Sequence, residues 1–147
     1  METIDVHHDY NVQPDALWKF IADFGDIEAW WPKGAAIDIE RVELEGEGVG
    51  MTRHIYNAGM PTPVSERLDA LDPDNWRWQL SIVGDRPAGL QRYQATGRIE
   101  PRAEGGCRIT YHGEFEAEPG REGEARKFLQ GAYSLMLQGL DAATRPA

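Results

Sequence analysis

The chain has 147 residues, of which 41% are hydrophobic and 27% are charged. This length suits a single domain, residues 1–147, that can bury a core without disulfides. The 25 acidic and 15 basic residues leave a formal net charge of −10. Nucleic acids and anionic membrane surfaces attract basic proteins, so this charge argues against both as partners.

The sequence indicates a cytoplasmic protein without membrane insertion. Its first residues contain no basic segment followed by an apolar one, as a secretory signal requires, and no apolar run approaches the length of a membrane span. Cys107 is the single cysteine, which excludes an intramolecular disulfide and a thiolate metal cluster. We expect a monomer or a weak homodimer.

The first third of the chain predicts one strand and two short helices. Residues 4–12 alternate between apolar and polar side chains, which is typical of a half-buried strand. Pro14 then stands at a first helical position, and apolar residues recur at helical spacing as far as Phe24. Residues 26–31 predict a second short helix, which ends at Pro32.

The rest of the chain predicts about six further strands and one long helix. From residue 37 to about 118, alternating segments are separated by turns rich in Gly, Pro, Asp and Asn. After Pro119, apolar residues recur at helical spacing as far as Leu140. This order predicts an α+β domain in which about seven antiparallel strands curve around the long C-terminal helix. Such a sheet leaves an internal cavity between itself and the helix.

An ordered set of motifs resembles the SRPBCC superfamily (START/Bet v 1-like), in its polyketide cyclase/dehydrase and lipid-transport group. The similar segments are residues 14–18, 23–25, 29–32, 48–53, 65–72, 92–93 and 106–111. The resemblance implies a helix-grip fold with a central cavity. Members of the superfamily include polyketide aromatase/cyclases, lipid carriers and the plant abscisic-acid receptors. Residues 58–61 and 84–90 resemble the gating loops of those receptors, so we expect loops 57–63 and 84–90 to gate the cavity.

Arg53 and Glu66 are the first candidates for a functional role. By alternation both side chains face inward, from strands that we expect to be hairpin neighbours. A buried charge is costly unless it is paired, so one interpretation is an ion pair that satisfies itself. The other is an anchor for the polar end of a ligand. In an enzyme, Arg53 would stabilise an enolate or oxyanion and Glu66 would move a proton.

Further candidates surround this pair. Tyr93 and Tyr111 would offer hydroxyl groups to the cavity, and Tyr93 would join Arg53 and Glu66 as a catalytic residue in an enzyme. The expected apolar wall consists of Met51, Trp76, Trp78 and Ile82, and the expected cover from the long helix consists of Phe128, Ala132, Tyr133 and Met136. His8 falls on an inward position by alternation, and Trp30 and Trp31 are expected at the cavity mouth or packed under a loop.

The sequence contains no motif typical of a metal site, a catalytic nucleophile or a phosphate-binding loop. His7, His54 and His112 fall on outward faces, and no His, Asp or Glu cluster has metal-ligand spacing. No serine or cysteine has the setting of a nucleophile, and no glycine-rich loop opens a helix to hold phosphate. We therefore expect neither a metal nor a cofactor.

Three functions remain open at this stage. The first is the binding of a small, mostly apolar molecule, such as a lipid, a polyketide or a similar metabolite, in the internal cavity. The second is a polyketide cyclase, aromatase or dehydratase that uses the same cavity. The third is an accessory domain that binds another protein, which a completely filled core would favour.

Overall fold

The computed structural model describes residues 1–145. Its strands are β1 (Glu2–Tyr10), β2 (Ile39–Glu45), β3 (Thr52–Asn57), β4 (Val64–Asp72), β5 (Arg77–Ile82), β6 (Leu90–Pro101) and β7 (Cys107–Ala117). Its α-helices are α1 (Pro14–Ala22) and α2 (Glu122–Thr144), and its 3-10 helices are η1 (Ile27–Ala29) and η2 (Pro87–Gly89).

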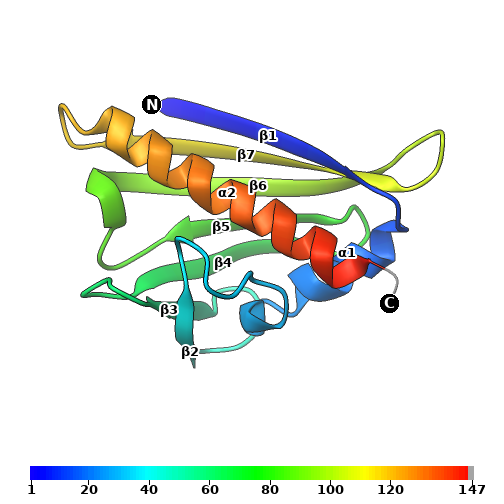
Figure 1. Ribbon diagram of the computed structural model, residues 1–147, viewed down its shortest axis with the longest axis horizontal. Helices are drawn as coiled ribbons and strands as arrows, with labels where there is room; N and C mark the ends of the chain where they lie inside the picture. The colour runs from blue at the N-terminus through cyan, green and yellow to red at the C-terminus, as the bar shows by residue number, and fades with distance from the viewer. Residues whose placement is uncertain (146–147) are drawn as a thin grey trace.

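The seven strands form one antiparallel sheet in the order β1-β7-β6-β5-β4-β3-β2. Figure 1 shows α2 running diagonally across one face of this sheet, with α1 near its C-terminal end. Each strand pairs with its sequence neighbour except β1, which closes against β7. This arrangement confirms the predicted helix-grip architecture.

The second predicted helix is shorter than expected. The helix α1 begins at Pro14. It buries Leu17 and Ile21 against the core, as the helical spacing predicts. The following segment forms only the three-residue 3-10 helix η1, in which the Trp30 amide bonds to the carbonyl of Ile27. The prediction of a helix over residues 26–31 is wrong in its extent, because a 3-10 turn needs fewer residues than an α-helix does.

The long helix α2 is attached to the β1 side of the sheet. The Tyr10 hydroxyl donates a hydrogen bond of 2.9 Å to the carbonyl of Leu137, and Arg126 Nη1 donates one of 2.9 Å to the carbonyl of Thr3. Gly113 on β7 lets the helix approach, because a side chain there would collide with the Tyr133 hydroxyl. Since these contacts hold α2 over β1 and β7, space is left between α2 and the opposite half of the sheet.

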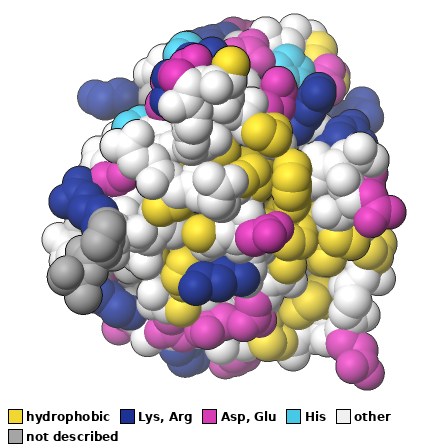
Figure 2. Space-filling view, turned by 90° about the vertical axis from the view of Figure 1, so that its right-hand side faces the viewer, with side chains coloured by type: hydrophobic (Ala, Val, Ile, Leu, Met, Phe, Trp, Pro, Cys, Tyr) yellow, Lys and Arg dark blue, Asp and Glu magenta, His cyan; other side chains and the backbone are white. Residues whose placement is uncertain are grey.

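The described residues contain neither a helix long and apolar enough to span a membrane nor a group of metal-ligating side chains. Figure 2 shows the face that carries the C-terminal end of α2, where acidic and basic side chains are intermixed around hydrophobic ones.

Candidate functional site

A partly enclosed cavity of about 80 Å³ lies between α2 and the β3–β5 half of the sheet. Its walls are mostly apolar, and its only charged lining residues within 1–145 are Arg53 and Glu66. The lining residues are Ile27, Trp30, Trp31, Ile37, Ile39, Arg53, Ile55, Asn57, Val64, Glu66, Ile82, Tyr93, Tyr111, Phe128, Leu129, Ala132, Tyr133 and Met136.

Arg53 and Glu66 form an ion pair at the sheet wall of this cavity. They are direct cross-strand partners on β3 and β4, which confirms that their strands are hairpin neighbours. Arg53 Nε and Nη2 lie 2.9 and 2.8 Å from Glu66 Oε1, and the side chains are 9% and 17% exposed. The pair therefore neutralises two charges that would be costly to bury separately.

Arg53 is also held on its other side. Its Nη1 donates a hydrogen bond of 2.9 Å to the carbonyl of Phe24, and its guanidinium lies 3.9 Å from the centre of the Phe24 ring. All three guanidinium nitrogens thus contact the protein. Both contacts from Arg53 use Oε1 of Glu66.

Three tyrosines line the same cavity. Tyr93 on β6 and Tyr133 on α2 share a hydrogen bond of 2.5 Å, and the rings of Tyr111 and Tyr133 meet edge to face at 4.8 Å. Burial raises the pKa of each hydroxyl above its ordinary value, and the nearby Glu66 carboxylate adds to this effect. The three hydroxyls are therefore neutral at physiological pH and act as hydrogen-bonding groups.

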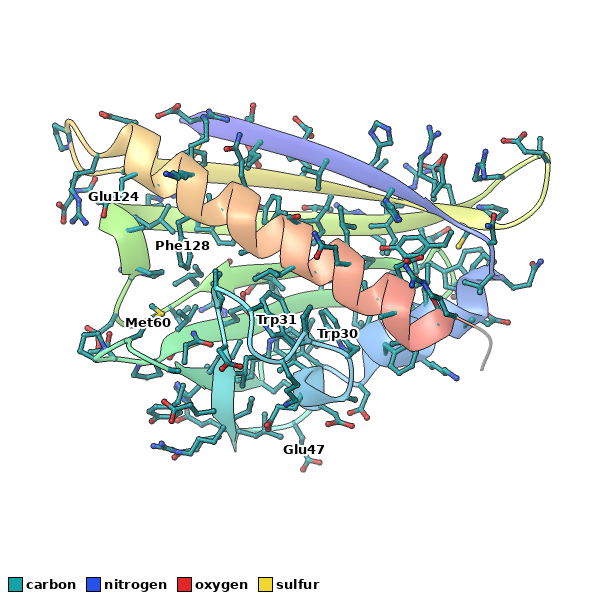
Figure 3. All side chains as sticks on the ribbon, viewed as in Figure 1. Trp30, Trp31, Glu47, Met60, Glu124 and Phe128 are labelled. Atoms are coloured by element: carbon teal, nitrogen blue, oxygen red, sulfur yellow. The ribbon has the colours of Figure 1, made fainter. Side chains whose placement is uncertain are left out.

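Partly exposed lining residues mark the cavity mouth. Trp31 and Ile37 come from the segment between η1 and β2, and Phe128 and Ala132 come from α2. Figure 3 shows Trp30 and Trp31 below α2 and Phe128 on the same side of that helix. A ligand would therefore enter between this segment and the helix.

Most of the predicted site residues do line the cavity. Those that do are Arg53, Glu66, Ile82, Tyr93, Tyr111, Phe128, Ala132 and Met136, together with Tyr133 of the expected helix cover. Their positions agree with the alternation of the strands and the spacing of the helix. Whether they bind a ligand or catalyse a reaction stays a proposal.

Three residues of the expected apolar wall lie elsewhere. Met51 precedes β3, in the turn whose backbone pairs with Leu68. Trp78 packs over Gly97, where it contacts Trp18, so its indole fills the core beside α1. Trp76 falls outside β5 with a positive φ of 49°, which removes it from the alternation that placed it inward.

His8 is exposed, so it does not reach the cavity as its inward position by alternation predicted. It lies on the edge strand β1, where its ring meets the edge of Tyr10 at 4.8 Å. Strands β7, β6 and β5 separate β1 from the strand that carries Glu66. His8 and Glu66 therefore lie on strands that are not neighbours in the sheet.

The expected gating loops contribute little to the lining. From loop 57–63 only Asn57 reaches the cavity, and loop 84–90 contributes no lining residue within the described chain. The second loop contains η2, which packs against the start of α2, with Gly89 directly beside Arg121. Whether either loop moves stays a prediction.

Asn57 is a site residue that the sequence reasoning assigned to a loop. It is the last residue of β3 and is 4% exposed. The signal was present, because Arg53, Ile55 and Asn57 continue one face of the strand by alternation. The structure also places Trp30 in the lining, where the sequence suggested packing as much as a site.

A protein-family model matches this chain over residues 1–145. The matching model describes polyketide cyclase / dehydrase and lipid transport. The chain belongs to this family. Within the SRPBCC superfamily, its fold is that of a hydrophobic ligand-binding domain. A comparison with curated proteins finds no match.

Solved structures with the same fold come from plants and bacteria. A norcoclaurine synthase point mutant from Thalictrum flavum, in complex with a transition-state analogue, aligns with a TM-score of 0.81 and 16% identity over 97% of this chain and 93% of that chain. The protein XoxI from Bacillus cereus aligns with a TM-score of 0.82 and 22% identity over 98% and 96%. A protein from Nitrosospira multiformis aligns with a TM-score of 0.77 and 19% identity over 98% and 97%. At these identities the likeness shows the fold.

Proposed function

We propose that this protein binds a small, mostly apolar molecule in the cavity between α2 and the sheet. The observation that carries the proposal is the lining itself, which is apolar except for one ion pair, one amide, two indole N–H groups and three tyrosine hydroxyls. Ligand sites commonly combine apolar walls with a few polar groups that orient the ligand. The family membership supports the same function.

The cavity volume of about 80 Å³ suggests a compact ligand. Pockets for drug-sized molecules commonly measure about 300 to 1,000 Å³, so a larger ligand needs the side chains at the mouth to move. Trp31 and Phe128 are the large partly exposed side chains there. A solved norcoclaurine synthase structure contains dopamine and hydroxybenzaldehyde, which are both small aromatic molecules. A ligand of one or two rings would therefore need the side chains of Trp31 and Phe128 to move aside, because a cavity of roughly 150 Å³ is known to hold a single benzene ring.

Native mass spectrometry of gently purified protein tests this proposal. We expect a bound molecule in stoichiometric amount, which denaturing extraction would release for identification. Ala132→Phe would place a ring in the cavity and abolish binding, whereas Gln130→Phe on the exposed face of the same helix would leave it unchanged. Protein that carries no molecule, and that takes up none of a panel of one- and two-ring apolar compounds, would refute the proposal.

A second candidate is a cyclase, aromatase or dehydratase that uses the same cavity. It is favoured by a lining that combines one carboxylate, Glu66, with three neutral tyrosines. Glu66 would remove a proton next to a carbonyl group, and a hydroxyl such as that of Tyr93 would donate a hydrogen bond to the enolate oxygen. Arg53 is less suited to that second role, because its nitrogens already contact Glu66 and Phe24.

Deuterium exchange of a cyclic ketone distinguishes the two candidates. An enzyme of this type would accelerate exchange at the carbon beside the carbonyl of 2-tetralone in D₂O, and Glu66→Gln would remove the acceleration while the ketone still binds. A binding protein would take up the ketone without changing its exchange rate. NMR measures both quantities in one sample.

A further inference from the structure

A second, open pocket of about 360 Å³ gathers three arginines. Its charged lining side chains within residues 1–145 are Arg67, Arg86, Arg92 and Glu114, so three positive charges and one negative charge sum to +2. The chain as a whole has a formal net charge of −10. The pocket is therefore a local reversal of charge, in which the arginines repel one another and a bound anion would relieve that repulsion.

The strand register places this pocket on the face of the sheet opposite to the internal cavity. Arg67 on β4, Ser81 on β5 and Gln94 on β6 are successive cross-strand partners, and all three line the pocket. Glu66 precedes Arg67, Tyr93 precedes Gln94, and both of these preceding residues line the internal cavity. Because successive residues of a strand point to opposite faces, the row from Arg67 to Gln94 lies on the outer face.

Arg67 has a close counter-charge within the protein. Its Nε lies 2.8 Å from Oδ1 of Asp69, and the Asp69 carboxylate also accepts hydrogen bonds from Ser81 and Gln94. Burial alone would raise the pKa of Asp69, but these hydrogen bonds hold that pKa below its ordinary value. Asp69 is therefore ionised at neutral pH, and it holds three lining residues together while neutralising Arg67.

The other two arginines keep hydrogen-bond donors for a ligand. Arg92 Nη1 lies 4.0 Å from Glu116 Oε1, which is beyond hydrogen-bond distance, and the Arg92 side chain is 71% exposed. Arg86 lies in the loop between β5 and β6, is exposed, and takes part in no ion pair or side-chain hydrogen bond within residues 1–145. A guanidinium is a planar fork of N–H donors that matches the oxygens of a carboxylate or phosphate.

We propose that this outer pocket binds a small, soluble, polyvalent anion through Arg86 and Arg92, while Arg67 adds to the positive potential. The ligand class is a molecule with phosphate groups or with several carboxylates, because more than one negative charge matches the charge of the lining. Pockets of about 300 Å³ or more accommodate small molecules, and this one measures about 360 Å³. The site is separate from the proposed function, and neither depends on the other.

Isothermal titration calorimetry at low salt measures the affinity for pyrophosphate and for citrate, with acetate as the monovalent comparison. The protein carries no tag before Met1, which also lines the pocket. The variants Arg86→Gln and Arg92→Gln each remove one charge from the pocket. The matched control is Arg41→Gln, which removes an equal charge from an exposed side chain of β2 outside the pocket.

A second control separates the outer pocket from the internal cavity. Ile82 and Tyr93 border both spaces, so an anion inside the cavity must be distinguished from one on the outer face. Ala132→Phe fills part of the internal cavity and leaves the outer lining unchanged. Backbone amide NMR signals of Ser81 and Gln94 report on the outer pocket directly.

We expect pyrophosphate, citrate or both to bind more tightly than acetate, and the binding to weaken as NaCl is added. Arg86→Gln and Arg92→Gln should each weaken it about fivefold, the factor that one exposed charge pair can supply. Arg41→Gln should change it by less than about twofold, since its charge lies outside the pocket. Glu114→Gln should tighten it, because the one acidic side chain of the lining is then neutral. Ala132→Phe should leave it unchanged.

Three outcomes would overturn the inference. The first is that neither pyrophosphate nor citrate binds more tightly than acetate. The second is an equal loss of affinity in Arg86→Gln, Arg92→Gln and Arg41→Gln, which would show a response to net charge alone. The third is binding that survives the combined substitution of Arg86 and Arg92, or that is lost in Ala132→Phe, because the anion would then lie elsewhere. None of these outcomes bears on the apolar ligand of the internal cavity.

Discussion

The buried ion pair predicts a large stability difference between two chemically identical substitutions. Glu66→Gln leaves the Arg53 guanidinium in the cavity wall without its counter-charge, at a site where the two side chains are only 9% and 17% exposed. Removing one partner of a buried pair typically costs about 3 to 5 kcal/mol. The glutamine still offers Arg53 a carbonyl acceptor, and the Phe24 carbonyl and ring still hold the guanidinium. We therefore expect a loss of about 2 to 3 kcal/mol in the free energy of unfolding.

The control uses an exposed pair on the neighbouring strand β2. Arg41 Nε lies 3.1 Å from Glu43 Oε2, with side chains that are 60% and 55% exposed. Glu43→Gln should change the free energy of unfolding by less than about 1 kcal/mol. Urea denaturation followed by tryptophan fluorescence measures both variants, with unchanged m-values as the sign that the comparison is valid.

A double substitution separates the burial of charge from the loss of contacts. Replacing the pair by Arg53→Met with Glu66→Leu removes both charges and should recover much of the stability lost in Glu66→Gln, because two apolar side chains need no counter-charge. If Glu66→Gln were no more destabilising than Glu43→Gln, solvent would be screening the pair, and the account of a neutralised cavity wall would be wrong.

Three further predictions concern the packing and ionisation of the core. Gly113→Ala should lower the free energy of unfolding by about 1 to 3 kcal/mol, because the new methyl group meets the Tyr133 hydroxyl, whereas Gly131→Ala at an open position of α2 should raise it by up to about 1 kcal/mol; equal effects in urea denaturation would contradict this packing. Burial raises the pKa of the Cys107 thiol and closes it from solvent, so Ellman's reagent should react with it only after unfolding, and rapid reaction with native protein would show that the core opens. Because the folded state holds certain tyrosine pKa values above the ordinary value near 10, the protonated hydroxyls favour folding, and stability should be retained below pH 10 and lost as the pH rises above it. Absorbance at 295 nm should show these four tyrosines ionising only with alkaline unfolding, and reversible ionisation of more than one of the five tyrosines in native protein near pH 10 would refute their burial. The tyrosines concerned are Tyr10, Tyr93, Tyr111 and Tyr133.

The local pattern of the sequence was sufficient for the architecture. Alternation identified the strands, and helical spacing identified α1 and α2, because these periods depend only on which face of an element is buried. The same alternation placed Arg53 and Glu66 inward on adjacent strands, where they form a direct cross-strand pair. The ordered motifs led to the family that the comparison then showed.

The local pattern predicted the wrong surroundings for residues that lie outside a regular strand, on an edge strand or away from the cavity. The positive φ of Trp76 takes it out of the alternation of β5. His8 has an inward position by parity, but β1 is an edge strand and the side chain is exposed there. Trp78 points inward as predicted, but it packs near α1 and lies outside the cavity lining.

The sequence by itself thus determined the fold class, the long helix over the sheet and the inward pair of opposite charges, Arg53 and Glu66. Only the tertiary structure decided where the helix sits, and therefore which inward side chains pack together and which face open space. It alone distinguished Trp30 from Trp31, because hydrogen-bond satisfaction depends on partners that the fold brings into reach: the indole of Trp31 meets the carbonyl of Ile37, whereas that of Trp30 meets no acceptor. Periodicity reports the direction of a side chain, and the atoms that complete its hydrogen bonds depend on how the elements are assembled.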